Sequence, residues 1–231
     1  MKKILLILVV TIFAAGLVFG LSACRKKKAA DIDITENVSY AETHRYTGAD
    51  EDFRVSVTSG IREKLFIADG KAQDVAPFTQ ITLIPLKANL SDKKYSFVLN
   101  YDGGNVEGEF SRDVVTHNFT ATVDGENFKD KITSIVIRYD DKENEIMLEN
   151  ALNGKIDYCK VLDIAKTEFR DEIGANTTDG VLNREIVIKL IRDRRNPDSP
   201  YYWYISFIAS DNSYWALLVN PETGEVVTKK N

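Results

Sequence analysis

The fold of the last third of the chain is decided by YYWYISFIA at residues 201–209 and YWALLV at residues 214–219. Both runs are rich in aromatic and β-branched residues, and Ser, Asp and Asn between them favour a turn, so they predict two neighbouring antiparallel strands. A third run, EIVIKLI at 185–191, predicts the strand before them. The turn NPETG at 220–224 then leads into a short last strand at Val226-Val227.

The residues before these strands predict a helix. Tyr158, Val161, Leu162, Ala165, Phe169 and Ile173 recur with helical spacing, and charged residues occupy the opposite side. Asp157 can cap the beginning of this helix and Gly174 can end it. A helix followed by an antiparallel sheet predicts a small α+β domain over residues 150–231, which we expect to fold on its own, though weakly.

The segment from Ala216 to Val227, ALLVNPETGEVV, resembles the closing signature of PepSY domains. That signature is a strand, a short turn containing Thr-Gly, and a final strand. The preceding helix and strands follow the same order, so the resemblance covers about residues 150–230, although the long connection at 193–200 departs from it. PepSY domains occur in secreted and membrane-attached bacterial proteins, and some are associated with peptidase inhibition. The resemblance therefore implies a PepSY-like fold and an envelope protein that restrains a peptidase.

Residues 51–149 show a different pattern, made of short runs with alternating polarity. The turns Asp102–Asn105 and Asp140–Asn144 separate neighbouring runs. This spacing predicts an antiparallel β-sandwich domain of immunoglobulin-like size, argued from strand count alone because the Cys…Trp…Cys core of antibody domains is absent. The expected strands are 53–57, 65–67, 80–86, 95–101, 106–110, 118–123, 132–139 and 145–148.

The chain begins with a predicted lipoprotein signal peptide at residues 1–23. Lys2 and Lys3 precede an apolar run over residues 4–21. The run ends in Leu21-Ser22-Ala23-Cys24, which resembles the bacterial lipobox, and this resemblance implies that Cys24 carries a diacylglyceryl group with acyl chains such as palmitate. The alternative is an uncleaved transmembrane anchor. We expect a protein anchored to the cell membrane on its extracytoplasmic side.

Residues 24–50 have no apolar period and predict a lipid-anchored tether. Its first residues, Arg25–Lys28, are basic, and each would add about 1 kcal/mol of attraction to anionic headgroups. A plain solvated charge run is the alternative. The membrane is thus the expected partner through Cys24 and this basic run.

Composition excludes several classes of function. The chain has 30 Lys and Arg against 35 Asp and Glu, which argues against a nucleic-acid partner. Its two histidines have no zinc spacing, and no Walker loop, GxGxxG or GxSxG motif is present. Ser91–Lys94 and Ser210–Asn212 match two of the three signatures of penicillin-binding proteins, but the third is absent and both segments are interpreted as turns. We therefore expect no catalytic residues, no metal and no cofactor. With Cys24 lipidated, Cys159 has no disulfide partner, and we interpret it as an inert, buried residue rather than a reactive thiol.

The aromatic residues Tyr202, Trp203, Tyr204 and Trp215 form the candidate partner surface. Alternation places Trp203 and Tyr204 on opposite faces of a strand, so one set covers the helix. The other set either binds a partner or packs against the sandwich, and the interface interpretation is slightly favoured. We expect a non-enzymatic binding or regulatory protein of the cell envelope. The alternatives are a structural subunit of an envelope complex and a hydrolase with an unrecognised site.

Overall fold

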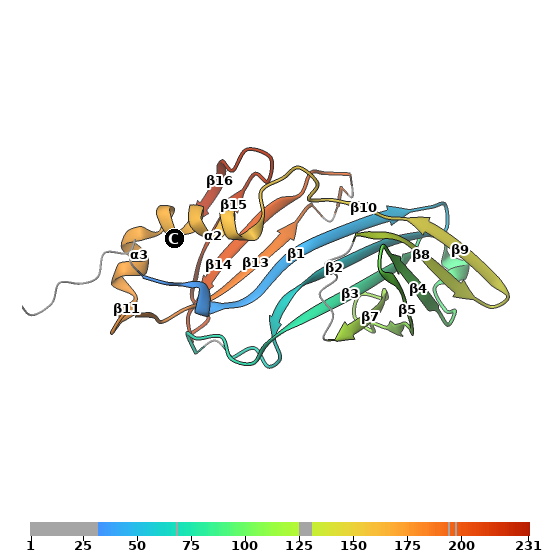
Figure 1. Cartoon of the computed structure of the whole chain (residues 1–231), viewed down its shortest axis with the longest axis horizontal. Coiled ribbons are helices and arrows are strands. Elements are labelled where there is room, and N and C mark those ends of the chain that lie inside the picture. Colours follow the sequence, from blue (N-terminus) through green and yellow to red (C-terminus); the bar gives the residue numbers. More distant parts are fainter. Residues whose placement is uncertain (1–31, 68, 125–130, 194, 197) are drawn as a thin grey trace, which may run out of the picture.

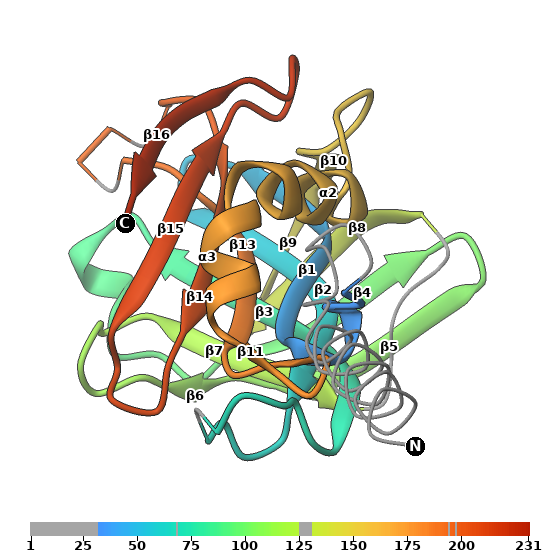
Figure 2. The same cartoon turned by 90° about the vertical axis from the view of Figure 1, so that its left-hand side faces the viewer.

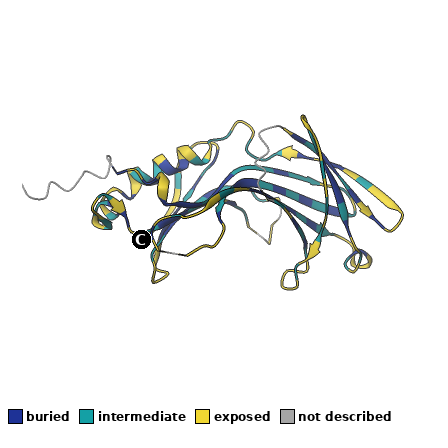
Figure 3. Ribbon diagram, turned by 60° about the horizontal axis from the view of Figure 1, so that its bottom comes forward, coloured by how far each residue is buried: buried dark blue, intermediate teal, exposed yellow. Residues whose placement is uncertain are grey.

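The computed structural model describes residues 32–67, 69–124, 131–193, 195–196 and 198–231. Cys24, the basic run and the signal peptide lie outside these residues. The described part is mostly β-structure, as predicted, with a large curved sheet, a smaller facing sheet and two α-helices at one end (Figure 1). Figure 3 shows buried residues along the large sheet and exposed residues on the outer sides of the helices.

Strand order in the large sheet is β16–β15–β14–β13–β1–β2–β3–β7–β6, and β10 also pairs with β1. The smaller sheet has the order β5–β4–β8–β9, and β11 and β12 form a separate pair. The strands are β1 (Val38–Ala49), β2 (Phe53–Glu63), β3 (Val75–Pro85), β4 (Ser96–Tyr101), β5 (Gly104–Glu109), β6 (Ser111–Arg112), β7 (Phe119–Asp124), β8 (Ile132–Tyr139), β9 (Lys142–Met147), β10 (Glu149–Asn150), β11 (Thr177–Thr178), β12 (Val181–Leu182), β13 (Glu185–Ile191), β14 (Tyr202–Ile208), β15 (Tyr214–Val219) and β16 (Val226–Lys230). The helices are α2 (Tyr158–Glu168) and α3 (Arg170–Ala175), with short 3-10 turns at Thr35–Asn37 (η2) and Ala88–Leu90 (η3).

Strand β1 joins the two halves of the molecule, so the predicted tether over residues 24–50 is wrong from Ile32 onward. Its first half pairs in parallel with β13, its second half pairs with β10, and β2 follows it on the other side. The blue strand in Figure 1 runs from the helices to the smaller sheet. Bulges between Val38 and Tyr40 and between Glu42 and His44 shift its register, and this hides the period of two that identifies a strand in sequence.

Glu42 stabilises the part of β1 that lies between its pairing with β13 and its pairing with β10. Pairing with β13 ends at Ala41 opposite Ile188. The buried Glu42 carboxylate then accepts the backbone N–H of Leu190 at 3.2 Å and two hydrogen bonds from Arg45 Nη2 at 2.7 and 2.8 Å. Burial raises the pKa of the Glu42 carboxyl, and the Arg45 charge opposes that shift. The Glu42 carboxylate thus accepts the Leu190 N–H of β13 at a position where the backbone of β1 no longer pairs with that strand.

The first hydrophobic core lies between the two helices and one face of β13–β15 (Figure 2). The predicted helix and its cap are confirmed, since Asp157 Oδ1 accepts the N–H of Lys160 at 2.8 Å. The helical run is divided at Phe169, where the backbone leaves helical geometry, and it ends at Ala175 rather than at Gly174. Phe207 and Trp215 stack in this core with ring centroids 4.6 Å apart.

The second core lies between β1–β3 and β7 on one side and the smaller sheet on the other. Phe53, Tyr95 and Tyr139 meet there, with Phe53 edge-on to both tyrosines at 5.6 and 5.3 Å. The predicted sandwich is therefore present. Within residues 51–149 the strand orders are β2–β3–β7–β6 and β5–β4–β8–β9, which correspond to the immunoglobulin orders A-B-E-D and C′-C-F-G, and β1 is an additional neighbour of β2.

The predicted boundary between residues 149 and 150 separates two cores but not two sheets. Strand β13 of the C-terminal part and β2 of the N-terminal part flank the same strand β1. The predicted strand at residues 65–67 is also wrong, because β2 ends at Glu63 and these residues lie in the connection to β3. That connection, residues 64–74, is called the β2–β3 loop below.

Candidate functional site

A groove occupies the face of the large sheet that the helices leave uncovered. Along β14, Trp203, Ile205 and Phe207 point toward the helices, so Tyr204 and Ser206 point to the opposite face. This open-face groove has a volume of about 520 Å³. Strands β1, β2, β13, β14 and β15 and the β2–β3 loop contribute its lining, which is Ser39, Tyr40, Arg62, Glu63, Phe66, Val187, Lys189, Tyr204, Ser206, Ile208, Asn212 and Tyr214.

Aromatic rings and cations form the walls of the groove. Tyr204 contacts Lys189, whose Nζ lies 5.6 Å from the ring centroid. At the β16 edge, Lys230 Nζ lies 3.5 Å from the ring centroid of Tyr214. Cations beside aromatic faces are a favourable arrangement and keep charge close to an apolar surface. The walls therefore combine apolar area with positive charge, although the chain as a whole has a formal charge of −5.

Small hydroxyl residues form the floor of the groove. Ser206 stands opposite Val187 on the neighbouring strand and is 2% exposed. Within the described part of the chain its hydroxyl has no hydrogen-bond partner, whereas Ser39 Oγ donates to Ile186 O at 3.3 Å. Ser206 lies in the lining of the groove, so its hydroxyl can hydrogen-bond a molecule bound there.

Two carboxylates at one end of the groove bind the backbone of the β2–β3 loop. Glu63 accepts the N–H groups of Gln73 at 2.6 Å and Ile67 at 3.4 Å. Glu185, which is fully buried, accepts the N–H of Asp69 at 2.9 Å, and its Oε2 has no partner among the described residues. Burial raises the pKa of the Glu185 carboxyl, while the Asp69 N–H lowers it. These carboxylates position the loop that carries Phe66.

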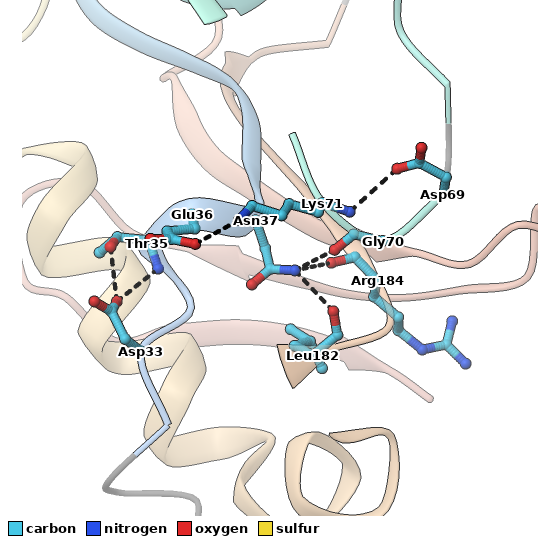
Figure 4. A network of polar contacts seen from close by, with 9 residues as sticks. All are labelled: Asp33, Thr35, Glu36, Asn37, Asp69, Gly70, Lys71, Leu182 and Arg184. Atoms are coloured by element: carbon cyan, nitrogen blue, oxygen red, sulfur yellow. Dashed lines mark hydrogen bonds and ion pairs between the residues drawn. The ribbon is translucent and has the colours of Figure 1, made fainter. Parts of the chain in front are cut away.

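Asn37 fastens the same loop to the beginning of β1 (Figure 4). Its Nδ2 donates to Leu182 O at 2.8 Å, to Arg184 O at 3.0 Å and to Gly70 O. Gly70 has a φ of +101°, and a Cβ there would lie 3.1 Å from the backbone of Asn183. Glycine is therefore required at this position, both by the backbone angle and by the close approach.

The structure separates the four aromatic residues of the predicted partner surface. Trp203 and Trp215 are buried in the helix-side core, and Trp203 Nε1 donates to Ile156 O at 3.0 Å, so neither tryptophan is available to a partner. Tyr202 and Tyr204 are half-buried on the open face, and of these two only Tyr204 lines the groove. The slightly favoured interface interpretation is not supported for Tyr204, because it borders a cavity rather than the sandwich.

Several groove residues were missed from sequence. Tyr40 lies in the segment assigned to a tether, and Phe66 in a run assigned to a strand. Lys189 and Arg62 are ordinary polar positions of strands, and nothing in the local sequence distinguishes them from other solvated charges. The alternation of β13 was visible in EIVIKLI and could have placed Lys189 on the face opposite the helix.

Substitutions on the two faces of β14 should change the free energy of unfolding by very different amounts. Replacing Trp203 with Ala should lower the free energy of unfolding by about 4 kcal/mol, because it removes a fully buried ring and leaves a cavity. Replacing its neighbour Tyr202 with Ala should cost about 1 kcal/mol or less. Urea denaturation followed by circular dichroism measures both changes. Equal losses for the two variants would contradict this assignment of faces.

Other candidate chemistry is sparse in the described residues. They contain no group of three His, Cys, Asp or Glu side chains arranged to hold a metal ion. None of their helices is long and apolar enough to cross a membrane. Cys159 is exposed on α2, so its interpretation as a buried residue is wrong. Comparisons with protein-family models, curated proteins and solved structures find no match to this chain.

Proposed function

We propose that this chain is a lipid-anchored, non-enzymatic binding protein of the cell envelope. Its ligand has an apolar body and a negatively charged group, and it binds in the open-face groove. The observation that carries the proposal is the groove itself, which joins aromatic walls, positive charge and the hydroxyl of Ser206 in about 520 Å³. Ligand pockets typically have volumes of roughly 300–1,000 Å³ and combine apolar lining with a few placed polar groups.

The groove favours binding over catalysis. Its described lining includes no histidine and no cysteine, which are common bases and nucleophiles of hydrolases. Glu63, the carboxylate of the lining, accepts loop N–H groups and so serves to hold the backbone. A hydrogen bond from Ser206 to a ligand is the chemistry that this lining supports best.

The anchoring and the family assignment rest on sequence. Attachment at Cys24 follows from the lipobox resemblance. A PepSY-like C-terminal part follows from the PepSY resemblance, and the order of α2, β13, β14, β15 and β16 supports it. Restraint of a peptidase depends on that resemblance alone. A role as an assembly subunit would instead need a partner that covers the open face.

An anionic aromatic dye, 1-anilinonaphthalene-8-sulfonate, tests the groove. We expect the folded protein to bind it with enhanced fluorescence, and Tyr204→Ser to weaken binding about tenfold, since loss of one aromatic contact of about 1.4 kcal/mol has that effect. Tyr202→Ser is the matched control, because Tyr202 lies on the same face outside the groove, and it should bind as the unmodified protein does.

The charge of Lys189 gives a second measurement. Lys189→Gln should weaken binding of the anionic dye and leave binding of the neutral dye Nile red unchanged, because only the anion loses an electrostatic partner. Equal affinity of all variants for the anionic dye would contradict the proposal. A loss in Tyr202→Ser as large as that in Tyr204→Ser would place the binding site elsewhere on the face.

A further inference from the structure

Three consecutive large apolar residues protrude from the β2–β3 loop. Leu65, Phe66 and Ile67 are 77%, 51% and 61% exposed, and together they are called the apolar tip. Single exposed apolar residues are ordinary, but contiguous ones mark contact with a partner or a membrane. Their place in sequence would suit a buried strand, yet they lie beyond the end of β2. Packing within the fold therefore does not account for three apolar side chains at this position.

The loop is built to display the tip and not to bury it. The Glu63 carboxylate holds the N–H of Ile67, and the Glu185 carboxylate holds the N–H of Asp69. On the far side of the loop, Asn37 Nδ2 donates to the carbonyl of Gly70. These contacts hold the loop backbone after the tip, and the pairing of β2 with β3, which reaches Glu63, holds it before the tip. The backbone that carries the three side chains is therefore fixed at both ends.

The same contacts bring the loop next to the beginning of the described chain. Lys71 Nζ lies 2.9 Å from Glu36 Oε2, one residue before Asn37 (Figure 4). The described residues begin at Ile32, and Cys24 lies eight residues earlier in the sequence. Eight residues span at most about 28 Å when fully extended. A lipid on Cys24 would therefore hold this end of the molecule, with the apolar tip, within reach of the bilayer surface.

We propose that the apolar tip inserts into the interface of the bilayer that holds the lipid on Cys24, and this inference rests on the proposed anchoring. An apolar group inserted beside a basic run is the combination that favours peripheral membrane contact. Arg25–Lys28 supply that run, and exposed Lys64 precedes the tip. Because Phe66 also lines the open-face groove, insertion places the mouth of the groove beside the lipid headgroups.

The test places an environment-sensitive fluorophore on the tip of the full, lipidated protein. Exposed Cys159 is first changed to Ser, and Leu65→Cys is then labelled, because Leu65 is the most exposed tip residue and does not line the groove. Val114→Cys is the matched control, since Val114 is an equally apolar residue of another loop, 83% exposed. Both proteins are bound to vesicles of phosphatidylcholine and phosphatidylglycerol.

Insertion predicts that brominated acyl chains quench the label at residue 65 severalfold more than the label at 114, and that aqueous iodide shows the opposite order. Equal quenching at both positions on vesicle-bound protein would overturn the insertion while leaving the anchor and the groove intact. Shielding of residue 65 from iodide without vesicles would show a protein-covered tip and would also overturn it. Failure of the lipidated protein to sediment with vesicles would overturn the anchoring, and the insertion with it. Binding of the anionic dye tests the groove independently of both.

Discussion

A fragment of residues 150–231 should be unfolded, although the helix and strand patterns of that segment predict a domain that folds on its own. Strand β13 has β1 as a neighbour in the sheet, and the fragment lacks β1. It also lacks Ile32, Ile34, Val38 and Ala41, all of which are buried in the helix-side core. Burial of the three larger side chains, Ile32, Ile34 and Val38, contributes about 1.5–3 kcal/mol each, and their loss together is as large as or larger than the roughly 3–5 kcal/mol of stability expected of a core of this size.

Circular dichroism and thermal unfolding measure this outcome. The fragment should show neither native β-signal nor a cooperative transition. The control is residues 32–231, which contain every described strand and should unfold cooperatively. A fragment 150–231 with a cooperative transition would show that β1 is dispensable and that the two predicted domains are separate.

Replacing Cys24 with Ala should abolish incorporation of a labelled fatty acid and release the protein from the membrane. The lipid is attached through the thiol, which Ala lacks, so labelling should fall to background. The basic run Arg25–Lys28 remains in this variant, yet charge attraction alone is weak and is screened by salt. Metabolic labelling with palmitate, followed by fractionation of cells in moderate salt, measures both effects.

The matched control for this experiment is Lys27→Gln, which removes one charge and keeps the thiol. It should retain full labelling and remain in the membrane fraction. Persistent labelling of Cys24→Ala would contradict attachment at this residue. Loss of label with unchanged membrane retention would instead support an uncleaved apolar anchor over residues 4–21.

Three strands and one helix cap were the most predictable parts of this fold. The predicted strands 132–139, 185–191 and 214–219 have the same bounds in the structure. The cap at Asp157 was also visible, because capping, alternation and turn chemistry depend on residues a few positions apart. Local patterns of this kind determined the class of the fold, with a helix on an antiparallel sheet beside a sandwich.

The groove could be predicted only in part. Alternation correctly separates Tyr204 from Trp203, but it does not say which face the helices cover. That choice placed both tryptophans in the core and left Tyr204 in the groove. Nothing near Ser206 in sequence indicates that Tyr40 and Phe66 lie around it, because these residues come from the other half of the chain.

By itself, then, the sequence determined the strands, the helix and the turns, since these follow from the short-range spacing of side chains. The tertiary structure alone decided that residues 38–49 form the strand that unites two cores. Val38 and Ile186 become neighbours only when the chain folds, and bulges erase the alternation that would have revealed the strand. The apolar tip was misassigned for a related reason. A run of apolar residues indicates burial, but Glu63, Glu185 and Asn37 bind the loop backbone beside this run. Of these three residues, Glu185 and Asn37 are far from the loop in sequence and approach it only when the chain folds.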